Sequence, residues 1–444
     1  MFIENLNIHS YKMLNEIELS FKKTSYKYFN DLNLTILVGE NGTGKSSILQ
    51  LLTHIFCPSE RKSHEIHEMN FTISYRMKDK SDKVYTYSHD MDYPVNYPKK
   101  LIVSSFFIFD PFRNSSYVRN HFTTEHIQEE TKYVYGGPSV GGYSSLDTII
   151  HPIIKALFIE DEDIKIKRYA SLLDKVGCQR LLSLEINRRK VRDYLYGRSP
   201  YRFSQEKMEI INEYNEKINQ FRRVKKSPKY RSGHILVDVS DIDRDFLNLY
   251  EKMLDIKVDP GIKDIIFVNS NGNEIPLSTM SSGEITLLFR FAPLIVEIED
   301  NSLILIDEPE THLHPAWIQE FIQNLLEFFE GYNTHFIIAT HSPLIASDVP
   351  SECVIGLKKE KDGIKKYIPA SRTLGGHSND ILKNVFRLNQ QSGDFSMNKI
   401  ERVANLLNKG DEESIDEAKK IYKDLSSTYE KFQIYEKYRD LLRG

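Results

Sequence analysis

The sequence predicts an α/β protein with a mostly parallel core sheet, an N-terminal antiparallel strand region and a helical insertion. Apolar runs at 34–38, 303–306 and 335–339 suit strands buried on both faces, and segments of helical periodicity separate them. Strands that alternate with helices indicate a parallel sheet. Residues 115–235 instead combine Gly/Ser/Tyr-rich turns with charged helical patterns, which indicates an insertion. No heptad series persists there, so a long coiled-coil arm is not expected.

The composition is that of a globular protein. The 444 residues are 40% hydrophobic and 27% charged, and the net charge of −4 argues against a chain that coats nucleic acid over its whole surface. Cys57, Cys178 and Cys353 have no CxxC spacing, which fits a reducing, cytoplasmic compartment and argues against a zinc ribbon. The N-terminus lacks the pattern of a signal peptide, and no window approaches 18 apolar residues, so no membrane span is expected.

The N-terminal part is predicted to contain two hairpins and two further strands. Apolar and polar residues alternate in 4–11 and 15–21, and again in 71–77 and 83–89, as in antiparallel pairs. The run KLIVSSFFIF at 100–109 is a further strand candidate.

The C-terminal part is predicted to return to the core. Ile285, Leu288, Phe291 and Ile295 form one stripe of a helix that begins near Gly283. A second helix is expected to begin at Pro315 and end near Gly331, and the charged segment from about 380 is predicted to be helical. We therefore divide the chain into 1–114, 115–260 (insertion or lid), 261–379 and a helical tail, 380–444.

The strongest motif is GENGTGKS, which fits G-x-x-x-x-G-K-[S/T] between a strand and a helix. Its glycines let backbone amides point at phosphate oxygens, Lys45 reaches the β and γ phosphates, and Ser46 ligates Mg²⁺. The predicted phosphate-binding residues are Gly39, Glu40, Asn41, Gly42, Thr43, Gly44, Lys45, Ser46 and Ser47.

Three further motifs follow along the chain. Asp307 and Glu308 end a buried strand, where the first acid can hold Mg²⁺ and the second can polarise a water. Ser281, Ser282, Gly283 and Glu284 precede a helix, and they suit either anion binding or ordinary N-capping. His341 follows a buried strand, where a histidine is often structural.

In this order the four motifs resemble those of the ABC-type ATPases, over about residues 1–110 and 260–350. The resemblance implies an ATPase head that binds ATP and Mg²⁺, with Glu308 as base and His341 as a γ-phosphate sensor. It also implies that Ser281 and Gly283 act on ATP held by another protomer. Because the chain has one copy of each motif, a complete site would require a head-to-tail homodimer or a higher oligomer.

Two family features are less clear in this sequence. The family has a metal-contacting glutamine after the strand at 100–109, and this chain has Asp110 in that place, a possible Mg²⁺ ligand. The family also has a residue against the adenine, for which Tyr11 and Lys12 are candidates.

The opening IENLNIHSYKMLNEIELSF, with DEPETHLHP and THSPLIA, resembles the RecF, SMC and OLD-like branch of the family. The stretches SSFFIFDPF and TLGGHSNDILKNVF resemble ATPases of bacterial anti-phage defence, first the Septu system and second the PARIS system. The Septu resemblance implies a separate HNH nuclease subunit as effector. The alternative is a RecF-like repair or replication ATPase that acts on DNA without an effector.

A second catalytic site is not evident. No Asp-x-Asp of a Toprim nuclease follows residue 345, and no His-Asn-His cluster is present, so nuclease chemistry is expected from a partner. His312 and His314 suit either a metal site or a helix start. The basic residues of 217–231 suit either a solvated helix end or contacts to nucleic-acid phosphates; the candidates are Arg222, Arg223, Lys225 and Lys226.

Overall fold

The computed structural model describes residues 1–23, 28–29, 32–57, 69–78, 83–91, 94, 96–105, 112, 131–136, 145–157, 163–196, 203–221, 233–256, 258–387 and 394–442. Asp110 and the four basic candidates, Arg222, Arg223, Lys225 and Lys226, lie outside these residues. The chain forms two compact units, 1–376 and 377–444, divided close to the expected boundary at 380.

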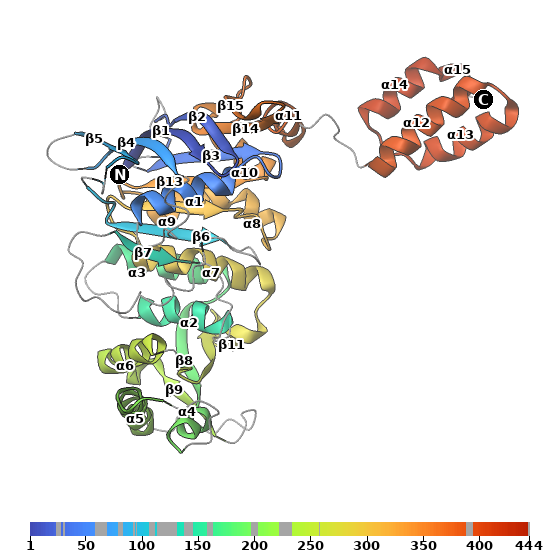
Figure 1. The fold of residues 1–444 in the computed structure, drawn as a ribbon. Helices are drawn as coiled ribbons and strands as arrows, with labels where there is room; N and C mark the ends of the chain where they lie inside the picture. The colour runs from blue at the N-terminus through green and yellow to red at the C-terminus, as the bar shows by residue number, and fades with distance from the viewer. Residues whose placement is uncertain are drawn as a thin grey trace. The chain divides into compact units, whose positions relative to one another are not determined.

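The core sheet has the strand order β15-β14-β3-β13-β12-β6-β7 (Figure 1). All neighbours are parallel except β14 and β15, so the predicted mostly parallel sheet is confirmed. Local patterns predicted the central strands but not β7, β14 or β15. The strands are β3 (Asn33–Gly39), β6 (Lys100–Ser105), β7 (Lys132–Tyr135), β12 (Leu303–Asp307), β13 (His335–Thr340), β14 (Val354–Glu360) and β15 (Gly363–Tyr367).

One face of the core sheet packs against α1 (Lys45–Phe56) and an N-terminal antiparallel sheet of order β2-β1-β4-β5. Both predicted hairpins are present. The first joins β1 (Phe2–Tyr11) to β2 (Leu14–Ser20), and the second joins β4 (Asn70–Arg76) to β5 (Val84–Ser88). Alternate apolar residues of these strands share one hydrophobic core with α1, which explains their period of two.

The other face packs against α7 (Ser282–Glu297), which precedes β12, and α9 (Phe321–Phe329), which follows it. Two short helices, α8 (Pro315–Gln319) and α10 (Pro343–Ser347), come after β12 and β13. Phe291 of α7 packs on Phe328 of α9 with ring centroids 5.1 Å apart, and Phe329 packs on Phe336 of β13 at 5.4 Å. The helix predicted from Pro315 begins there, but it is divided at Glu320 into α8 and α9.

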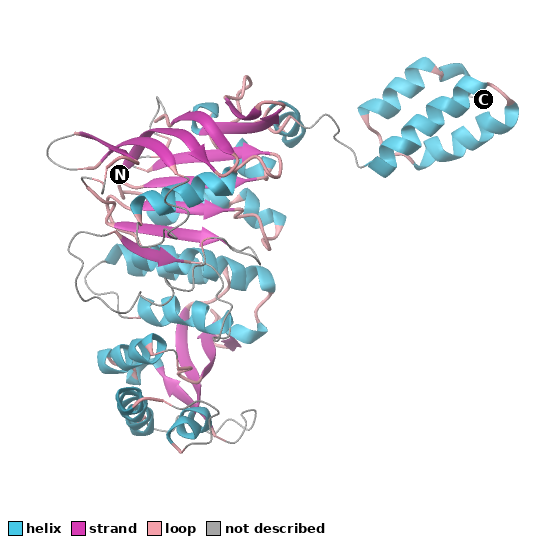
Figure 2. Cartoon of the chain, in the orientation of Figure 1, coloured by secondary structure: helices cyan, strands magenta, loops and turns pink. Residues whose placement is uncertain are grey.

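The sequence predicted a helical insertion, but the insertion also contains strands. It contributes to an antiparallel sheet of order β11-β10-β8-β9, visible among its helices in Figure 2. Because β8 pairs with β10 across a long stretch of chain, local periodicity could not reveal this sheet. The elements of the insertion are α2 (Ser145–Ala156), α3 (Asp163–Lys175), β8 (Arg180–Asn187), α4 (Arg188–Leu195), α5 (Gln205–Gln220), β9 (His234–Asp238), a 3₁₀ turn (Val239–Asp241) and α6 (Arg244–Asp255). The segment after the insertion adds β10 (Ile262–Val268), β11 (Glu274–Pro276) and a second 3₁₀ turn (Leu277–Thr279).

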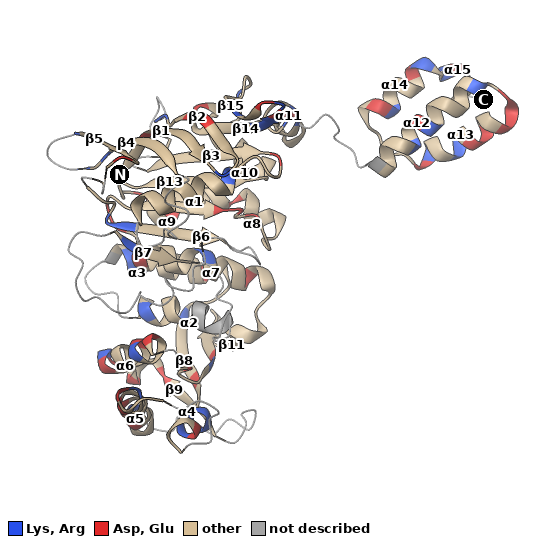
Figure 3. Cartoon of the chain, in the orientation of Figure 1, with Lys and Arg blue, Asp and Glu red and all other residues tan. Residues whose placement is uncertain are grey.

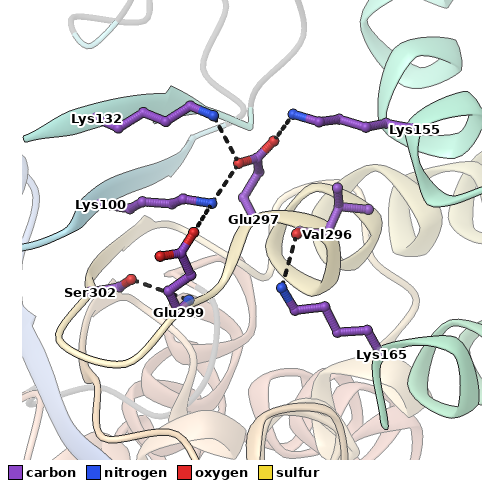
Figure 4. Close-up of polar contacts among 8 residues, drawn as sticks. All are labelled: Lys100, Lys132, Lys155, Lys165, Val296, Glu297, Glu299 and Ser302. Carbon is purple, nitrogen blue, oxygen red and sulfur yellow. Dashed lines mark hydrogen bonds and ion pairs between the residues drawn. The ribbon is translucent and has the colours of Figure 1, made fainter. Parts of the chain in front are cut away.

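A charged cluster joins the end of α7 to the core sheet and the insertion (Figure 4). The Glu297 carboxylate pairs with Lys100 of β6 at 2.9 Å, with Lys132 of β7 at 3.5 Å and with Lys155 of α2. Lys100 also pairs with Glu299 at 2.7 Å. Burial opposes ionisation of Glu297, but the three lysines outweigh it and hold the pKa of this carboxyl well below its usual range.

The second unit is helical, as predicted for the tail, and Figure 3 shows acidic and basic residues interspersed along α12, α13 and α14. A small core lies between these helices. Gly410 has a φ of 75° and Asp411 caps the next helix, so the predicted turn is confirmed. The helices are α11 (Ser378–Asn384), α12 (Asp394–Lys409), α13 (Glu412–Asp424), α14 (Tyr429–Lys437) and α15 (Arg439–Leu442). No helix among the described residues is long and apolar enough to cross a membrane.

Candidate active site

Three of the predicted motifs lie at the carboxyl edge of the core sheet. β3, β13, β12 and β6 are consecutive and parallel, so the segments that follow them emerge on the same side. The phosphate loop follows β3, Asp307 ends β12 and His341 follows β13. In open α/β sheets this edge is where ligands bind.

The phosphate loop is a tight turn that only glycine can make. Gly42 and Gly44 have φ of 75° and 88°, in the left-handed region. A Cβ on Gly39 would lie 2.3 Å from the Leu357 carbonyl oxygen, and one on Gly44 would lie 2.5 Å from Cδ2 of Leu14. The strand before the loop and the helix after it are both present, as the motif requires.

Lys45 is held inside the loop. Its Nζ donates to the carbonyl oxygens of Gly39 at 2.9 Å and Glu40 at 3.1 Å. Burial lowers the Lys45 pKa to about 8, while the carboxylates of Glu308 and Asp307 partly oppose that shift. A phosphate group beside the amine would stabilise its charged form and offer stronger acceptors than the two carbonyls.

Ser46 and Asp307 form the candidate metal site. The Ser46 hydroxyl donates to Asp307 Oδ1 at 3.1 Å, although the two residues lie 261 positions apart in the chain. Hydroxyl and carboxylate oxygens are the ligands that Mg²⁺ prefers, and phosphate and water oxygens usually complete its coordination. These residues therefore fit Mg²⁺.

Glu308 is held in a strained conformation beside His341. Its φ is 48°, and its N–H donates to the Ala339 oxygen at 2.8 Å. His341 Nε2 lies 3.2 Å from Glu308 Oε1. This hydrogen bond is the largest cause of the lowered Glu308 pKa, so the carboxylate is ionised at neutral pH. Backbone strain of this kind is common at functional sites.

Two residues that the sequence reading missed fix this pair in place. Glu310 accepts hydrogen bonds from the Thr340 hydroxyl at 2.8 Å and from the His341 N–H at 2.5 Å. The buried Arg290 donates to the Thr311 oxygen at 2.7 Å, and burial lowers its pKa to about 9. A single arginine within the apolar stretch TLLFRFAPLIV was the available signal, because a charge in a buried helix needs a specific partner.

The Ser-x-Gly motif lies at the start of α7 and caps it. The Ser281 hydroxyl accepts from the Glu284 N–H at 3.3 Å, and the Ser281 N–H donates to the Glu284 carboxylate at 2.7 Å, which is a capping box. Ser281 and Ser282 are exposed. Gly283 lies under Trp317, whose Cζ3 would be 3.0 Å from an added Cβ. The capping role is confirmed, and the anion-binding role stays a prediction.

The remaining candidates are placed as follows. His314 is the N-cap of α8 and accepts from the Ala316 N–H at 3.3 Å, which confirms the helix-start interpretation. Within the described ranges, no group of three or more His, Cys, Asp or Glu could hold a metal. Tyr11 is buried beside His54, whereas Lys12 is exposed and donates to Gln50 of α1. Lys12 is therefore the more accessible of the two adenine candidates.

A phosphate loop, an aspartate whose surroundings fit Mg²⁺ and an adjacent glutamate on one sheet edge are the arrangement of a phosphate-loop ATPase site. A family model for the AAA ATPase domain (AAA_15) matches residues 1–346, and the chain belongs to this family. This match supports the predicted resemblance to the ABC-type ATPases of the RecF, SMC and OLD-like branch.

Three relatives share low identity with the chain. Protein ea59 of Escherichia phage lambda is 24% identical over 84% of this chain and 60% of its own length, so the chain spans less than two thirds of that relative. Retron Vc95 probable ATPase of Vibrio cholerae is 24% identical over 86% of this chain and 78% of its own length. Septu protein PtuA of Bacillus thuringiensis is 28% identical over 35% of this chain and 43% of its own length.

Among solved structures, the SMC head domain from Thermotoga maritima superposes with a TM-score of 0.35 and 12% identity. The match covers 84% of this chain and 100% of that domain.

Proposed function

We propose that the chain binds and hydrolyses ATP with Mg²⁺, assembles with further copies around ATP, and regulates a separate effector nuclease in anti-phage defence. The observation that carries the ATPase proposal is the convergence of Ser46, Asp307 and the Glu308–His341 pair beside the phosphate loop. Members of the AAA ATPase domain family provide the general precedent.

The residues divide the catalytic work among themselves. Lys45 exchanges its two carbonyl acceptors for phosphate oxygens and neutralises charge there. Ser46 and Asp307 would hold Mg²⁺, which would neutralise phosphate charge when bound. The ionised Glu308 accepts a proton from the attacking water.

The Glu308–His341 contact restrains the proposed base. While His341 donates to Oε1, one acceptor of the carboxylate is occupied. A γ-phosphate within reach of His341 would compete for the same donor and return that acceptor to the water. This competition would link hydrolysis to correct phosphate placement.

Assembly around ATP is supported by the position of the Ser-x-Gly motif. Ser281 and Ser282 are exposed at the start of α7, directly after the second 3₁₀ turn, Leu277–Thr279. The helix start offers amides and a positive dipole end to an anion, and the neighbouring copy would bring that anion as bound ATP. In a head-to-tail dimer, or a larger oligomer built from it, the ATP bound by each copy would meet the Ser-x-Gly motif of its neighbour.

The effector proposal depends on the relatives. One is named a retron ATPase and another a Septu protein, and the sequence resemblance to Septu implies an HNH nuclease partner. Co-purification from the native operon tests the pairing, and a chain that always purifies alone would contradict it. The second candidate is a RecF-like ATPase acting on DNA, which strong DNA stimulation of hydrolysis by the lone chain would favour. Contact between nucleic acid and Arg222, Arg223, Lys225 or Lys226 belongs to the same test.

Glu308→Gln tests the ATPase proposal itself. Loss of a positioned general base lowers turnover by about 100-fold or more. The variant should retain ATP and shift to the assembled form in light scattering. Glu320→Gln, an exposed carboxylate at the division between α8 and α9, is the matched control and should behave as wild type. Wild-type hydrolysis by the Glu308 variant would show that another group is the base.

A further inference from the structure

Ser105 ends β6 with a buried hydroxyl that lacks a hydrogen-bond partner within the described part of the chain. Its exposed fraction is 0%. Buried hydroxyls almost always have a partner, so such an orphan indicates a ligand, ion or water that completes it.

The strand register places this hydroxyl beside the metal site. Ser105 is the parallel partner of Asp307, and partners on neighbouring strands face the same side of the sheet. Asp307 faces α1, since its carboxylate accepts from Ser46. Leu101 and Val103, which alternate with Ser105 along β6, lie in the core shared with α1 and so confirm that face.

Ser105 and Asp307 lie at different distances from the phosphate loop, and this gives them different roles. β12 lies between β6 and the strands nearer the phosphate loop, so Ser105 is one strand, roughly 4.8 Å, beyond Asp307. Mg²⁺ usually keeps several of its waters in protein–nucleotide sites. A hydroxyl at this remove can accept a hydrogen bond from such a water and donate its own.

We propose that Ser105 is a positioning residue of the magnesium site, where its hydroxyl orients a water carried by the Mg²⁺ that Ser46 and Asp307 hold. This inference rests on the proposed ATPase function. The Ser105 hydroxyl would gain its hydrogen-bond partner when the metal and the nucleotide bind. The site would then include a residue of β6 as well as one of β12.

The chain contains a matched control in the preceding residue. Ser104 is equally buried, at 1% exposed, and its Oγ also has no partner within the described part of the chain. It pairs with Ile306 and faces the opposite side of the sheet. Ser104→Ala and Ser105→Ala therefore remove the same group from the same strand, but only the second removes it from the metal face.

The test measures Mn²⁺ affinity by the EPR signal of the free ion, with the full chain and a non-hydrolysable ATP analogue. Ser105→Ala should weaken Mn²⁺ binding by about 10-fold, the size typical of an outer-shell partner. Ser104→Ala should leave it unchanged, and Ser105→Thr, which keeps the hydroxyl, should restore it. Binding of the analogue without metal should be the same in all variants.

Thermal unfolding provides a readout that needs no turnover. Without ligands, Ser105→Ala should melt no lower than wild type, because it removes a buried unpartnered group. Its gain in Tm on adding Mn²⁺ and the analogue should be smaller than that of wild type. Equal Mn²⁺ affinity in wild type and Ser105→Ala, or equal losses in both alanine variants, would overturn the proposal. If wild type itself binds no nucleotide, the proposed function fails, and this inference fails with it.

Discussion

Replacing Glu297 by Gln should destabilise the head far more than replacing Glu299 by Gln. Both carboxylates pair with Lys100, at 2.9 Å and 2.7 Å, and they lie two residues apart. The side chain of Glu297 is 11% exposed and also faces Lys132 and Lys155, whereas the side chain of Glu299 is 41% exposed.

The magnitude follows from what each change leaves behind. Glu297→Gln leaves Lys100 paired with Glu299 but removes the carboxylate from Lys155 and Lys132. Removing one partner of a buried ion pair costs 3–5 kcal/mol, and the half-exposed Lys132 favours the lower end, about 3 kcal/mol. Glu299→Gln alters a partly exposed pair and should cost about 1 kcal/mol or less.

Urea unfolding followed by circular dichroism measures both variants against wild type. The pKa of Glu297 is depressed, so its contribution is fully present above pH 4.5 and is lost as pH falls through the lower folded-state value. The difference between wild type and Glu297→Gln should therefore persist at pH 5 and shrink only in stronger acid. Equal losses for the two variants, or a loss below about 1 kcal/mol for Glu297→Gln, would refute the reasoning.

Three further predictions concern Gly283, Trp317 and His335. Gly283→Val should lose about 1–3 kcal/mol in urea unfolding because its side chain overlaps the Trp317 ring, and Trp317→Leu should recover part of that loss. Trp317 is the only tryptophan and lies against Gly283 of the Ser-x-Gly motif, so its fluorescence reports on that motif. The emission should change when ATP and Mg²⁺ assemble the Glu308→Gln variant. Unchanged emission on assembly would place the motif outside the interface between copies. Burial lowers the His335 pKa to about 3, so the unfolded chain binds a proton that the folded chain does not, and stability should fall as pH drops from 6.5 towards 3; His335→Gln should flatten this slope in urea titrations.

The parts of the site that local sequence could predict are those carried by short motifs. A glycine-rich loop between a buried strand and a helix predicts the phosphate-loop conformation, and the backbone at Gly39, Gly42 and Gly44 has that conformation. Asp307 ends its strand as expected and meets Ser46. The N-terminal hairpins were also predictable, because alternation in a two-layer core is a local pattern.

The parts that could not be predicted depend on pairings between distant segments. β8 pairs with β10, and the register of that pairing cannot be predicted from the sequence of either strand alone. Arg290 donates to a carbonyl oxygen in the loop after β12, and Glu310 of that loop accepts from the N–H of the first residue after β13. Only the folded sheet brings these segments together. Ser105 belongs to no motif. Its proposed role follows from its register with Asp307 and from the absence of a hydrogen-bond partner for its hydroxyl within the described residues.

One strand and one helix connect the two halves of the proposed ATP chemistry. β6 begins at Lys100, which is bonded to Glu297 near the end of α7, and it ends at Ser105 on the metal face. α7 begins at the exposed Ser-x-Gly motif, and its last turn also receives Lys155 from α2 and Lys165 from α3. A buried ion pair resists sliding because neither charge can be left alone. The strand that ends at Ser105, the helix that begins at the Ser-x-Gly motif and the first helices of the insertion are therefore linked by contacts at the end of α7. A displacement of α2 would break the Lys155–Glu297 pair at the end of α7.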